Sequence, residues 1–373
     1  MILLKSFVLG GAEKQALYLA GELQNQRNCR VFIYSYIPSK TRSLFDAECQ
    51  KYQLKNLYVV ANPLSAAGSF KYVKRRIKLF LFGRKLRKHS PDLIIPYLNP
   101  PSIIANVCYR IAGAKKTFWH HRGVDYYRKD AIEKLAANRT QYFIANSQNG
   151  AEELMKELQL QKKTPYSLAN FSTIENINRA NKEDVKREYS IPKDALVIGM
   201  IAHFRAEKHQ RVLVEACFSL FKSNAKIHLV LVGNDYSTNE EESEFKSIVA
   251  MIKASKHEDR ITILHNTNSQ DVLSMFDLGV LLSANEGMPN VIMEYMAYAL
   301  PIITNPHAGC TELLGEDYEY FAQSKTHEVA ERISQFINNL DLRSTVGQKN
   351  EKRLDERFSI DRYITNLEAI LNS

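Results

Sequence analysis

The chain has 373 residues, more than a single hydrophobic core usually supports, so we expect two domains. With 45% apolar and 24% charged residues, its composition excludes a wholly disordered, a collagen-like and a disulfide-stapled protein. The net charge of +9 equals the nine Lys and Arg residues between Phe70 and His89, a segment without acids, so the sequence predicts one local basic surface and no nucleic-acid partner.

Two further features limit where the protein works. No apolar run approaches the roughly 18–20 residues of a membrane span, and residues 1–9 are too short for the apolar core of a signal peptide. The five cysteines lie at least 20 positions apart, so no CxxC pair exists and no structural zinc site is expected. Scattered cysteines without an export signal are typical of reduced thiols, and we therefore expect a cytoplasmic protein.

Short β-branched runs alternate with amphipathic stretches along the whole chain, a pattern typical of βα units and parallel sheets. In the first half, the expected strands are residues 2–9, 30–36, 57–60, 93–96, 116–120 and 142–145. In the second half, they are residues 195–201, 227–232, 261–264, 278–282 and 301–304, and helices are expected at about 208–222, 241–255, 269–276, 290–299 and 325–338. Runs as apolar as residues 228–232 must be covered on both faces.

This alternation predicts two Rossmann-like α/β domains, residues 1–170 and 171–357. The joint is expected in the polar stretch 170–193, where the periodic apolar pattern stops. The tail, residues 358–373, carries an apolar stripe with helical spacing. Periodicity leaves open whether this tail packs on its own domain or returns to the first.

The densest group of candidate site residues follows a buried strand of the second half. Glu286 and Glu294 stand eight positions apart around the start of a helix, at the carboxyl end of a strand, where open α/β sheets bind ligands. Pro289 suits the first helical turn, and the free N–H groups of Asn290 and Val291 form a ready anion site. The two carboxylates can grip sugar hydroxyls on either side of a phosphate. The alternative is a helix-capping Glu286 and a solvated surface Glu294.

Two other strand-to-helix turns carry candidate ligand groups. Arg205 and Lys208 bring two cations to the turn after residues 195–201, where they can neutralise a diphosphate. Gly10 and Gly11 permit a tight turn after the first strand and a close approach of backbone N–H groups to a ligand. The alternatives are a basic pair on a surface loop and a plain glycine turn. Neither GxGxxG nor GxxxxGK[ST] occurs, which argues against a standard dinucleotide site and a P-loop.

A fourth group, Trp119-His-His-Arg-Gly-Val-Asp125, lies at the carboxyl end of another strand. His120 and His121, with Arg122, can position an acceptor or a leaving phosphate. The two rings cannot face the same way, because side chains alternate along a strand. The alternative is a histidine that serves only as a structural hydrogen-bonding group.

Taken together, these segments resemble glycosyltransferase family 4, the retaining enzymes with the GT-B fold among the glycosyl transferases of group 1. The resemblance covers nearly the whole chain and rests on the segment from Glu286 to Glu294 and on the following further matches: Gly10-Gly-Ala-Glu13, Ala145-Asn-Ser147, Asn170, Ala299-Leu-Pro-Ile-Ile-Thr304 and Gly309-Cys-Thr-Glu312. It implies two Rossmann-like domains whose parallel sheets face a central cleft, with the acceptor side in residues 1–170 and the nucleotide sugar in residues 171–357.

The resemblance also implies roles for the donor-side residues. Glu294 would bind the ribose, and Glu286 would be a catalytic residue facing the donor sugar. Arg205 and Lys208 would neutralise the departing diphosphate. The full donor-binding set is Gly10, Gly11, Arg205, Lys208, Asn266, Asn268, Gly287, Met288, Pro289, Asn290, Val291 and Glu294, in which Asn266 and Asn268 would border the base.

Two assignments stay open within this resemblance. On the acceptor side, His120 or His121 would be a catalytic residue lining the cleft, and the sequence does not decide which. On the donor side, many relatives have an arginine five residues before the lysine, at a position that His203 holds here, so either His203 or Arg205 would take that role.

The implied activity is transfer of a sugar, with retention, from a nucleotide diphosphate sugar to a glycan or a lipid-linked acceptor in the synthesis of lipopolysaccharide, capsule or exopolysaccharide. UDP is expected more than GDP. No DxD triplet occurs, so neither a metal nor another cofactor is expected. Two alternatives stay open: a nucleotide-sugar epimerase or phosphorylase-like enzyme on the same fold, and a catalytically silent membrane-associated scaffold.

The basic segment, residues 70–88, predicts an amphipathic helix. Its apolar stripe consists of Phe70, Val73, Ile77, Phe80 and Leu81, and the rest is largely Lys and Arg. Such a helix can lie on an anionic membrane, where lipid-linked acceptors are presented. We therefore expect peripheral contact with the inner face of the cell membrane. The alternative is an ordinary sheet-covering helix with a solvated basic face.

Overall fold

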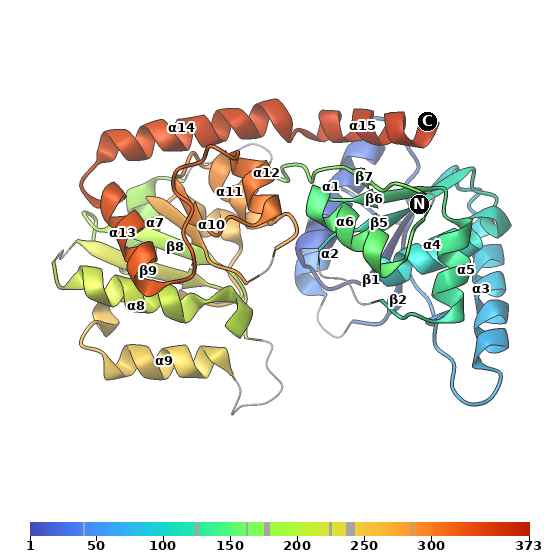
Figure 1. Ribbon diagram of the computed structural model, residues 1–373, viewed down its shortest axis with the longest axis horizontal. Helices are drawn as coiled ribbons and strands as arrows, with labels where there is room; N and C mark the ends of the chain where they lie inside the picture. The colour runs from blue at the N-terminus through green and yellow to red at the C-terminus, as the bar shows by residue number, and fades with distance from the viewer. Residues whose placement is uncertain are drawn as a thin grey trace. The chain divides into compact units, whose positions relative to one another are not determined.

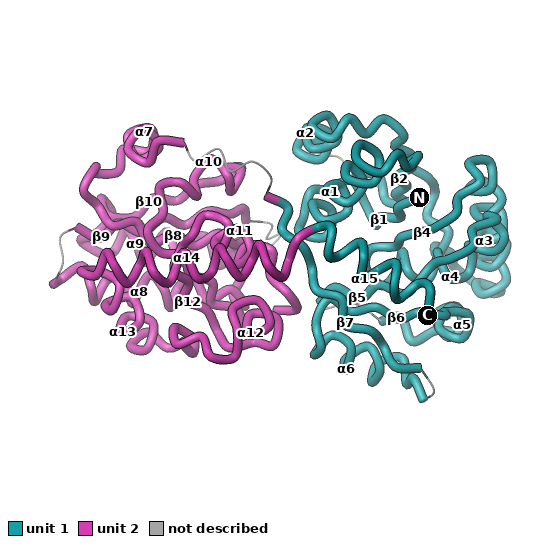
Figure 2. The backbone as a smooth tube through the Cα atoms, turned by 90° about the horizontal axis from the view of Figure 1, so that it is seen from above, with its two compact units in different colours: residues 1–173, 360–373 teal, residues 174–359 magenta. Residues whose placement is uncertain are grey.

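The structure is a computed structural model that describes residues 1–39, 42–123, 127–161, 163–174, 180–223, 226–235, 243–284 and 286–373. The chain forms two compact units, shown in Figures 1 and 2. Unit 1 comprises residues 1–173 and 360–373, and unit 2 comprises residues 174–359. The first residues of the helix expected at 241–255 lie outside the described part of the chain.

Unit 1 is built on a parallel sheet whose strands, within the described residues, run in the order β3-β2-β1-β4-β5-β6-β7. The strands are β1 (Ile2–Ser6), β2 (Ile33–Ile37), β3 (Leu57–Val59), β4 (Leu93–Pro96), β5 (Lys116–His121), β6 (Tyr142–Ala145) and β7 (Tyr166–Ser167). The helices are α1 (Gly11–Asn25), α2 (Ser43–Lys51), α3 (Lys71–Arg87), α4 (Asn99–Ala112), α5 (Ala131–Arg139), α6 (Gln148–Glu157) and α15 (Ile360–Asn372). The strand order reverses between β1 and β4, which marks a topological switch point.

Both faces of this sheet are covered, as the continuous apolar strands require. Leu4 and its same-face neighbours pack into one core with α1, α2 and α15. Leu3, one position earlier, belongs to the other core, which α3, α4, α5 and α6 cover. Adjacent residues of β1 therefore enter opposite cores, because side chains alternate along a strand.

The C-terminal helix α15 packs on unit 1. The ring of Tyr363 lies 4.7 Å from that of Phe171, edge to face, and Leu367 and Leu371 are buried in the same core. The hydroxyl of Tyr142 donates to the carbonyl of Leu371 at 3.0 Å. The chain thus leaves unit 1 after β7 and returns to it at Ile360, which settles the question that periodicity left open.

Unit 2 has a smaller parallel sheet, with the order β10-β9-β8-β11-β12 within the described residues. Its strands are β8 (Leu196–Ile201), β9 (Ile227–Val232), β10 (Ile261–Leu264), β11 (Leu278–Leu281) and β12 (Ile302–Thr304). Its helices are α7 (Lys182–Glu188), the short 3₁₀ helix η1 (Ala206–Lys208), α8 (Gln210–Phe221), α9 (Glu244–Ala254), η3 (Glu258–Arg260), α10 (Ser269–Leu273), α11 (Asn290–Ala297), α12 (Ala308–Leu314), α13 (Thr326–Ile337) and α14 (Leu340–Arg357). The predicted class of two parallel α/β domains is confirmed.

Three of the elements that the sequence did not predict have a local explanation. The two residues of β7 are exposed and too few for a periodic signal. Helix α7 lies inside the stretch predicted as a polar joint, because it buries little besides Val185 and Lys186. Helix α14 packs through widely spaced residues, including the small Gly347 and the polar Asn350, and so lacks an apolar stripe.

No helix in the described ranges is both long and apolar enough to cross a bilayer.

The buried histidine of β9 makes the stability of unit 2 depend on pH. His228 is 4% exposed, and its Nε2 lies 2.8 Å from the hydroxyl of Thr262. Burial, and secondarily the charge of Arg260, lowers its pKa from 6.5 to about 4. The unfolded chain therefore binds more protons between these values, so stability is full above pH 6.5 and falls as the pH drops towards 4.

His228→Gln keeps a side chain that can hydrogen-bond Thr262 but removes the titrating ring. The free energy of unfolding should therefore fall less on acidification in the variant than in the unmodified chain. The difference is up to about 1.4 kcal/mol for each pH unit. Urea denaturation at neutral and mildly acidic pH measures this difference. Equal losses in the two proteins would show that His228 does not contribute to the pH dependence.

Candidate active site

Lys208 and Glu286 form an ion pair at the carboxyl edge of the unit 2 sheet. Lys208 ends η1, which follows β8, and Glu286 follows β11, the strand next to β8. The ammonium of Lys208 donates to Oε1 of Glu286, which also accepts a hydrogen bond of 2.8 Å from the hydroxyl of Ser283. The side chains of Lys208 and Glu286 are 22% and 17% exposed, so the pair is partly accessible to a ligand. The structure thus joins a predicted phosphate-binding cation to the predicted catalytic carboxylate.

Backbone contacts from both sides position the loop that carries Glu286. The N–H of Ala284 donates to the carbonyl of Glu207 in η1 at 2.7 Å. The N–H of Ser283 donates to Oδ1 of Asn305, after β12, at 2.8 Å, and the ring of His307 bonds the carbonyl of Ser283. These contacts tie Ser283 and Ala284, which precede Glu286, to the ends of β8 and β12.

Helix α12 packs directly against Gly287 and Met288, which follow Glu286. A Cβ added to Gly309 would lie 1.4 Å from the carbonyl oxygen of Gly287 and 2.9 Å from Cα of Met288. Gly309 is therefore the residue that allows the first turn of α12 to touch the loop. Met288 is buried, whereas Gly287 is partly exposed.

Helix α11 places the second acid below the surface. Helix α11 begins at Asn290, as predicted, and Pro289 is its N-cap and so precedes the first helical turn in which it was expected. Glu294 is only 7% exposed, so the alternative of a solvated surface acid is wrong. The hydroxyl of Tyr295 accepts a 2.9 Å hydrogen bond from the N–H of Ile201 and so ties α11 to the end of β8. Val291 and Asn290 lie in the partly exposed first turn.

Arg205 lies apart from the Lys208–Glu286 pair. Its side chain is 55% exposed, and its guanidinium is 3.6 Å from the carboxylate of Glu207. His203 is exposed as well, and its pKa is lowered by desolvation and by the charges of Arg205 and Lys208, so its ring is neutral at neutral pH. The choice between Arg205 and His203 stays a prediction.

The polar groups of the segment after β10 hydrogen-bond to nearby groups of unit 2. The backbone N–H of Asn266 donates to Oδ1 of Asn234 at 2.8 Å, and Asn266 has a left-handed φ of 52°. Asn268 caps α10, because its Oδ1 accepts from the N–H of Gln270 at 3.3 Å. His265 donates from Nδ1 to the carbonyl of Gly233 at 2.7 Å. A role of Asn266 and Asn268 at the base remains a prediction.

The glycine pair of unit 1 starts the first helix. Gly10 is the extended N-cap of α1, and Gly11 is its first residue. The carboxylate of Glu13 accepts hydrogen bonds from the backbone N–H groups of Gly10 and Glu13. Burial raises the pKa of Glu13, and these hydrogen bonds and the charges of Arg122 and Lys5 oppose that rise. The turn therefore faces a partly buried acid beside an arginine.

The two predicted histidines lie at the end of β5 and are both fully buried. Nδ1 of His120 is 3.0 Å from the carbonyl oxygen of Pro96, and its ring packs against Tyr97. His121 has its Nδ1 3.0 Å from the hydroxyl of Tyr127 and its Nε2 3.6 Å from Glu153. Their partners differ, in agreement with the alternation along a strand.

Residues 181–353, the stretch that contains Lys208, Glu286 and Glu294, match the family model described as "Glycosyl transferases group 1". The likeness to the group 1 glycosyl transferases thus lies within unit 2. The N-acetyl-alpha-D-glucosaminyl L-malate synthase of Bacillus anthracis is 28% identical over 189 residues, which make up 50% of this chain and 48% of that protein. The capsular polysaccharide biosynthesis glycosyltransferase CapM of Staphylococcus aureus is 21% identical over 260 residues, 68% of this chain and 67% of that protein. The chain thus matches about half the length of the first relative and two thirds of the second.

Solved structures similar to the whole chain show that it has the GT-B fold. HepE of Anabaena, in complex with UDP and glucose, has a TM-score of 0.79 and 18% identity over 100% of this chain and 98% of its own. A point mutant of TarM from S. aureus, in a complex that includes UDP, has a TM-score of 0.72 and 12% identity over 100% of this chain and 99% of its own. At these identities the likeness concerns the fold alone.

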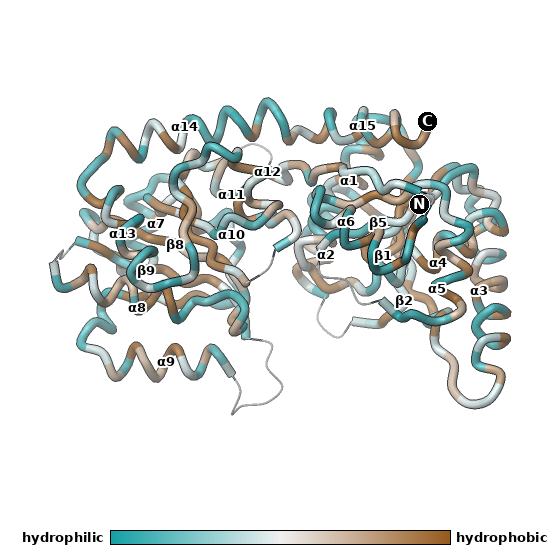
Figure 3. The backbone as a smooth tube through the Cα atoms, viewed as in Figure 1, coloured by the Kyte–Doolittle hydropathy of each residue, from teal (hydrophilic) through white to brown (hydrophobic). Residues whose placement is uncertain are grey.

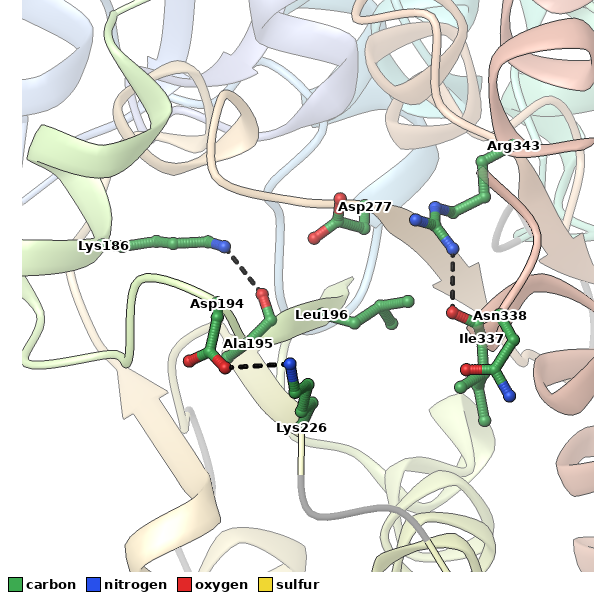
Figure 4. A pocket seen from close by; sticks show the side chains of 9 residues that line it. All are labelled: Lys186, Asp194, Ala195, Leu196, Lys226, Asp277, Ile337, Asn338 and Arg343. Carbon is green, nitrogen blue, oxygen red and sulfur yellow. Dashed lines mark hydrogen bonds and ion pairs between the residues drawn. The ribbon is translucent and has the colours of Figure 1, made fainter. Parts of the chain in front are cut away.

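A pocket of about 260 Å³ in unit 2, shown in Figure 4, lies where β8, β9 and β11 begin, at the edge of the sheet opposite to the candidate site. It is lined by Lys186, Asp194, Ala195, Leu196, Lys226, Asp277, Ile337, Asn338 and Arg343. Its charged groups are already satisfied: Lys186 donates to the carbonyl of Ala195 at 2.6 Å, and Lys226 is 3.3 Å from Asp194. Since the strands start here, this pocket does not contain the strand ends that position the candidate site residues.

Sequence reasoning missed several groups near the carboxyl edge of the unit 2 sheet. Asn305 and His307 follow β12 and hold the Ser283 backbone, and Phe204 and Phe245 pack around His265. For Asn305 and His307, a polar residue soon after a predicted strand was the available signal, because all parallel strands end at one edge.

Proposed function

We propose that the chain is a retaining, metal-independent hexosyltransferase of glycosyltransferase family 4 that moves a sugar from a UDP-sugar to a glycan or lipid-linked acceptor. The observation that carries the proposal is the pairing of Lys208 with Glu286, which joins a cation for a diphosphate to a carboxylate for a sugar. The UDP in the Anabaena HepE structure supports the choice of base. The name of S. aureus CapM supports a role in the synthesis of cell-surface polysaccharide.

In the proposed reaction, the bond from the anomeric carbon to the diphosphate oxygen breaks, and a bond from that carbon to an acceptor oxygen forms on the same face. Negative charge gathers on the departing diphosphate, where the ammonium of Lys208 and the first turn of α11 stabilise it. The proton of the acceptor hydroxyl passes to the departing phosphate oxygen. Once Lys208 binds phosphate, Glu286, still held by Ser283, is free to accept from a sugar hydroxyl, and Glu294 accepts from the ribose.

Calorimetric titration with UDP, UDP-sugars and GDP-sugars tests the donor side. We expect uridine nucleotides to bind and, without acceptor, free sugar to be released slowly. Appearance of an epimerised nucleotide sugar would instead favour an epimerase. A chain that binds no nucleotide at millimolar concentration would contradict the proposal and favour a catalytically silent protein.

Helix α3 leaves an apolar stripe exposed. Its buried residues, Leu79, Phe82, Gly83 and Leu86, face the rest of unit 1, and a Cβ added to Gly83 would lie 2.9 Å from the side chain of Ile111 in α4. The exposed stripe consists of Val73, Ile77, Phe80 and Leu81, which are 50%, 55%, 47% and 58% exposed, with Phe70 before the helix at 78%. At about 100° per residue, these two sets point in nearly opposite directions. Figure 3 shows apolar and polar residues alternating along α3.

Cations border this exposed stripe on both sides. By their helical positions, the flanking residues are Lys74, Lys78 and Lys85 on one side and Arg76 and Arg87 on the other. Arg75 is different, since its guanidinium pairs with Asp130 at 3.1 Å. Apolar side chains bordered by cations suit a surface of anionic lipid, where each cation contributes about 1 kcal/mol. We therefore also propose that the enzyme is cytoplasmic and that α3 holds it at the inner face of the cell membrane.

Replacement of Ile77 and Phe80 together by Glu tests the membrane contact. We expect partitioning onto vesicles of phosphatidylglycerol and phosphatidylcholine to fall by about tenfold or more, since each buried CH₂ contributes about 0.8 kcal/mol. Leu340→Glu is the matched control, because Leu340 is 69% exposed on α14 of unit 2. Sedimentation with vesicles measures both. Equal binding of the two variants, or binding that ignores the anionic lipid, would refute this contact.

A further inference from the structure

Arg122 lies at the place in unit 1 where a doubly wound sheet binds ligands. It directly follows β5, which pairs with β4, and β4 pairs with β1 at the reversal of strand order. Ligands of open α/β sheets bind beyond the carboxyl ends of the strands at such a reversal. The Gly10 turn ends β1 at the same edge, and the acid of this turn, Glu13, feels the charge of Arg122.

Three groups hold the guanidinium of Arg122 in place. Its Nη2 donates to Oδ1 of Asn170 at 2.7 Å, and its Nη1 lies 3.3 Å from Nε2 of His120. The guanidinium carbon lies over the ring of Tyr97, 5.0 Å from its centre. His120, Tyr97 and Asn170 are each at most 3% exposed, so the holding groups are buried while Arg122 itself is partly exposed.

The hydrogen-bond partner of Nδ1 of His120 decides which of its two ring nitrogens carries the proton. The carbonyl of Pro96 can only accept a hydrogen bond, so Nδ1 of His120, 3.0 Å away, carries the proton. Nε2 then has its lone pair and accepts from Arg122. Burial, together with the charge of Arg122, lowers the pKa of His120 well below its usual value, which keeps the ring neutral. His120 is therefore placed to orient Arg122.

Arg122 keeps donors available for a ligand. A guanidinium has five N–H groups, and the contacts to His120 and Asn170 use two of them. In the described part of the chain, no carboxylate lies within ion-pair distance of Arg122. A guanidinium fork binds planar oxyanions through paired, charge-assisted hydrogen bonds.

We propose that Arg122 is the anion-binding residue of unit 1, that it takes a phosphate or carboxylate group of a substrate, and that His120 and Asn170 are its positioning residues. The inference rests on the proposed function in one respect, that the anion belongs to one of the two substrates of a glycosyl transfer. It gives His120 a positioning role in place of the catalytic role that was predicted for His120 or His121. The anion is either the diphosphate of the nucleotide sugar or an acidic group of the acceptor.

Titrations of the full chain with UDP, inorganic phosphate and succinate separate these two sources. UDP affinity is measured by calorimetry, and phosphate and succinate by the rise in Tm at constant ionic strength. The variants are Arg122→Gln, Arg122→Lys and the control Arg110→Gln, an exposed arginine on α4. A fall of about tenfold or more in UDP affinity for Arg122→Gln assigns the anion to the nucleotide. Unchanged UDP affinity with loss of the phosphate or succinate response assigns it to the acceptor.

Asn170→Asp distinguishes binding from a merely structural role. The substitution keeps the size of the side chain but sets a carboxylate against Arg122, so it should abolish the response to phosphate or succinate while the Tm without ligand stays equal or rises. If the unmodified chain does not bind UDP, that result counts against the proposed function. The titrations with phosphate and succinate then decide whether Arg122 binds an anion. UDP affinity and anion responses that are the same in Arg122→Gln, Asn170→Asp and the unmodified chain would overturn the inference.

Discussion

Lys208→Met is expected to lower the rate of sugar transfer by about 100-fold or more, the usual effect of losing one preorganised group that stabilises developing negative charge. The ammonium of Lys208 is the cation that the structure places against Glu286, and Arg205, paired with Glu207, does not replace it there. If Lys208 acts mainly on the departing diphosphate, kcat falls while the KM for the UDP-sugar changes little. Steady-state kinetics with a fixed acceptor measures both constants.

Two further variants make this expectation specific. Glu286→Gln should lose activity as well, and the double variant should lose less than the product of the two single effects, because the residues contact each other. Lys226→Met is the matched control, since Lys226 is an exposed lysine paired with Asp194 at the opposite edge of the same sheet. Additive losses in the double variant, or an equal loss in the control, would reject the pair as the reacting centre.

The sequence predicted the parallel sheets because their strands are continuous apolar runs bounded by polar turns. Residues 227–232 were predicted as a strand, and β9 has those bounds. The neighbourhood of Lys208 and Glu286 was predictable for a related reason, since each follows a strand and parallel strands end at one edge. The adjacency of β8 and β11, which brings the two side chains into contact, depends on strand order, and chain order does not give it.

Side-chain partners were beyond the reach of sequence spacing. The sequence left open whether His120 or His121 acts in catalysis. The partners of His120, Pro96 and Arg122, come from two different strand ends, and Asn170 joins Arg122 from 48 positions further on. Likewise, Glu294 looked equally like a surface acid, because the burial of one helix face depends on what packs against it. Spacing places residues on an edge or a face, whereas tertiary packing decides which atoms meet.

Gly309→Ala is expected to reduce activity far more than its effect on folding explains. The new Cβ would lie 1.4 Å from the carbonyl oxygen of Gly287, so either α12 or the loop that carries Glu286 must move. Overpacking of this kind costs about 1–3 kcal/mol of stability. Displacement of a catalytic group by about 1 Å can reduce the rate by about 100-fold. Urea denaturation and the kcat of the folded protein measure the two effects separately.

Gly347→Ala provides the control for this pair of measurements. A Cβ there would lie 1.8 Å from the carbonyl oxygen of Ala299, so the clash is similar, but it falls between α14 and the segment after α11. A similar loss of stability with nearly full kcat is therefore expected for Gly347→Ala. If both variants lose kcat in proportion to their loss of stability, the loop at Gly287 does not control the position of Glu286. If only Gly309→Ala loses kcat, the contact between α12 and this loop is part of what makes the site active.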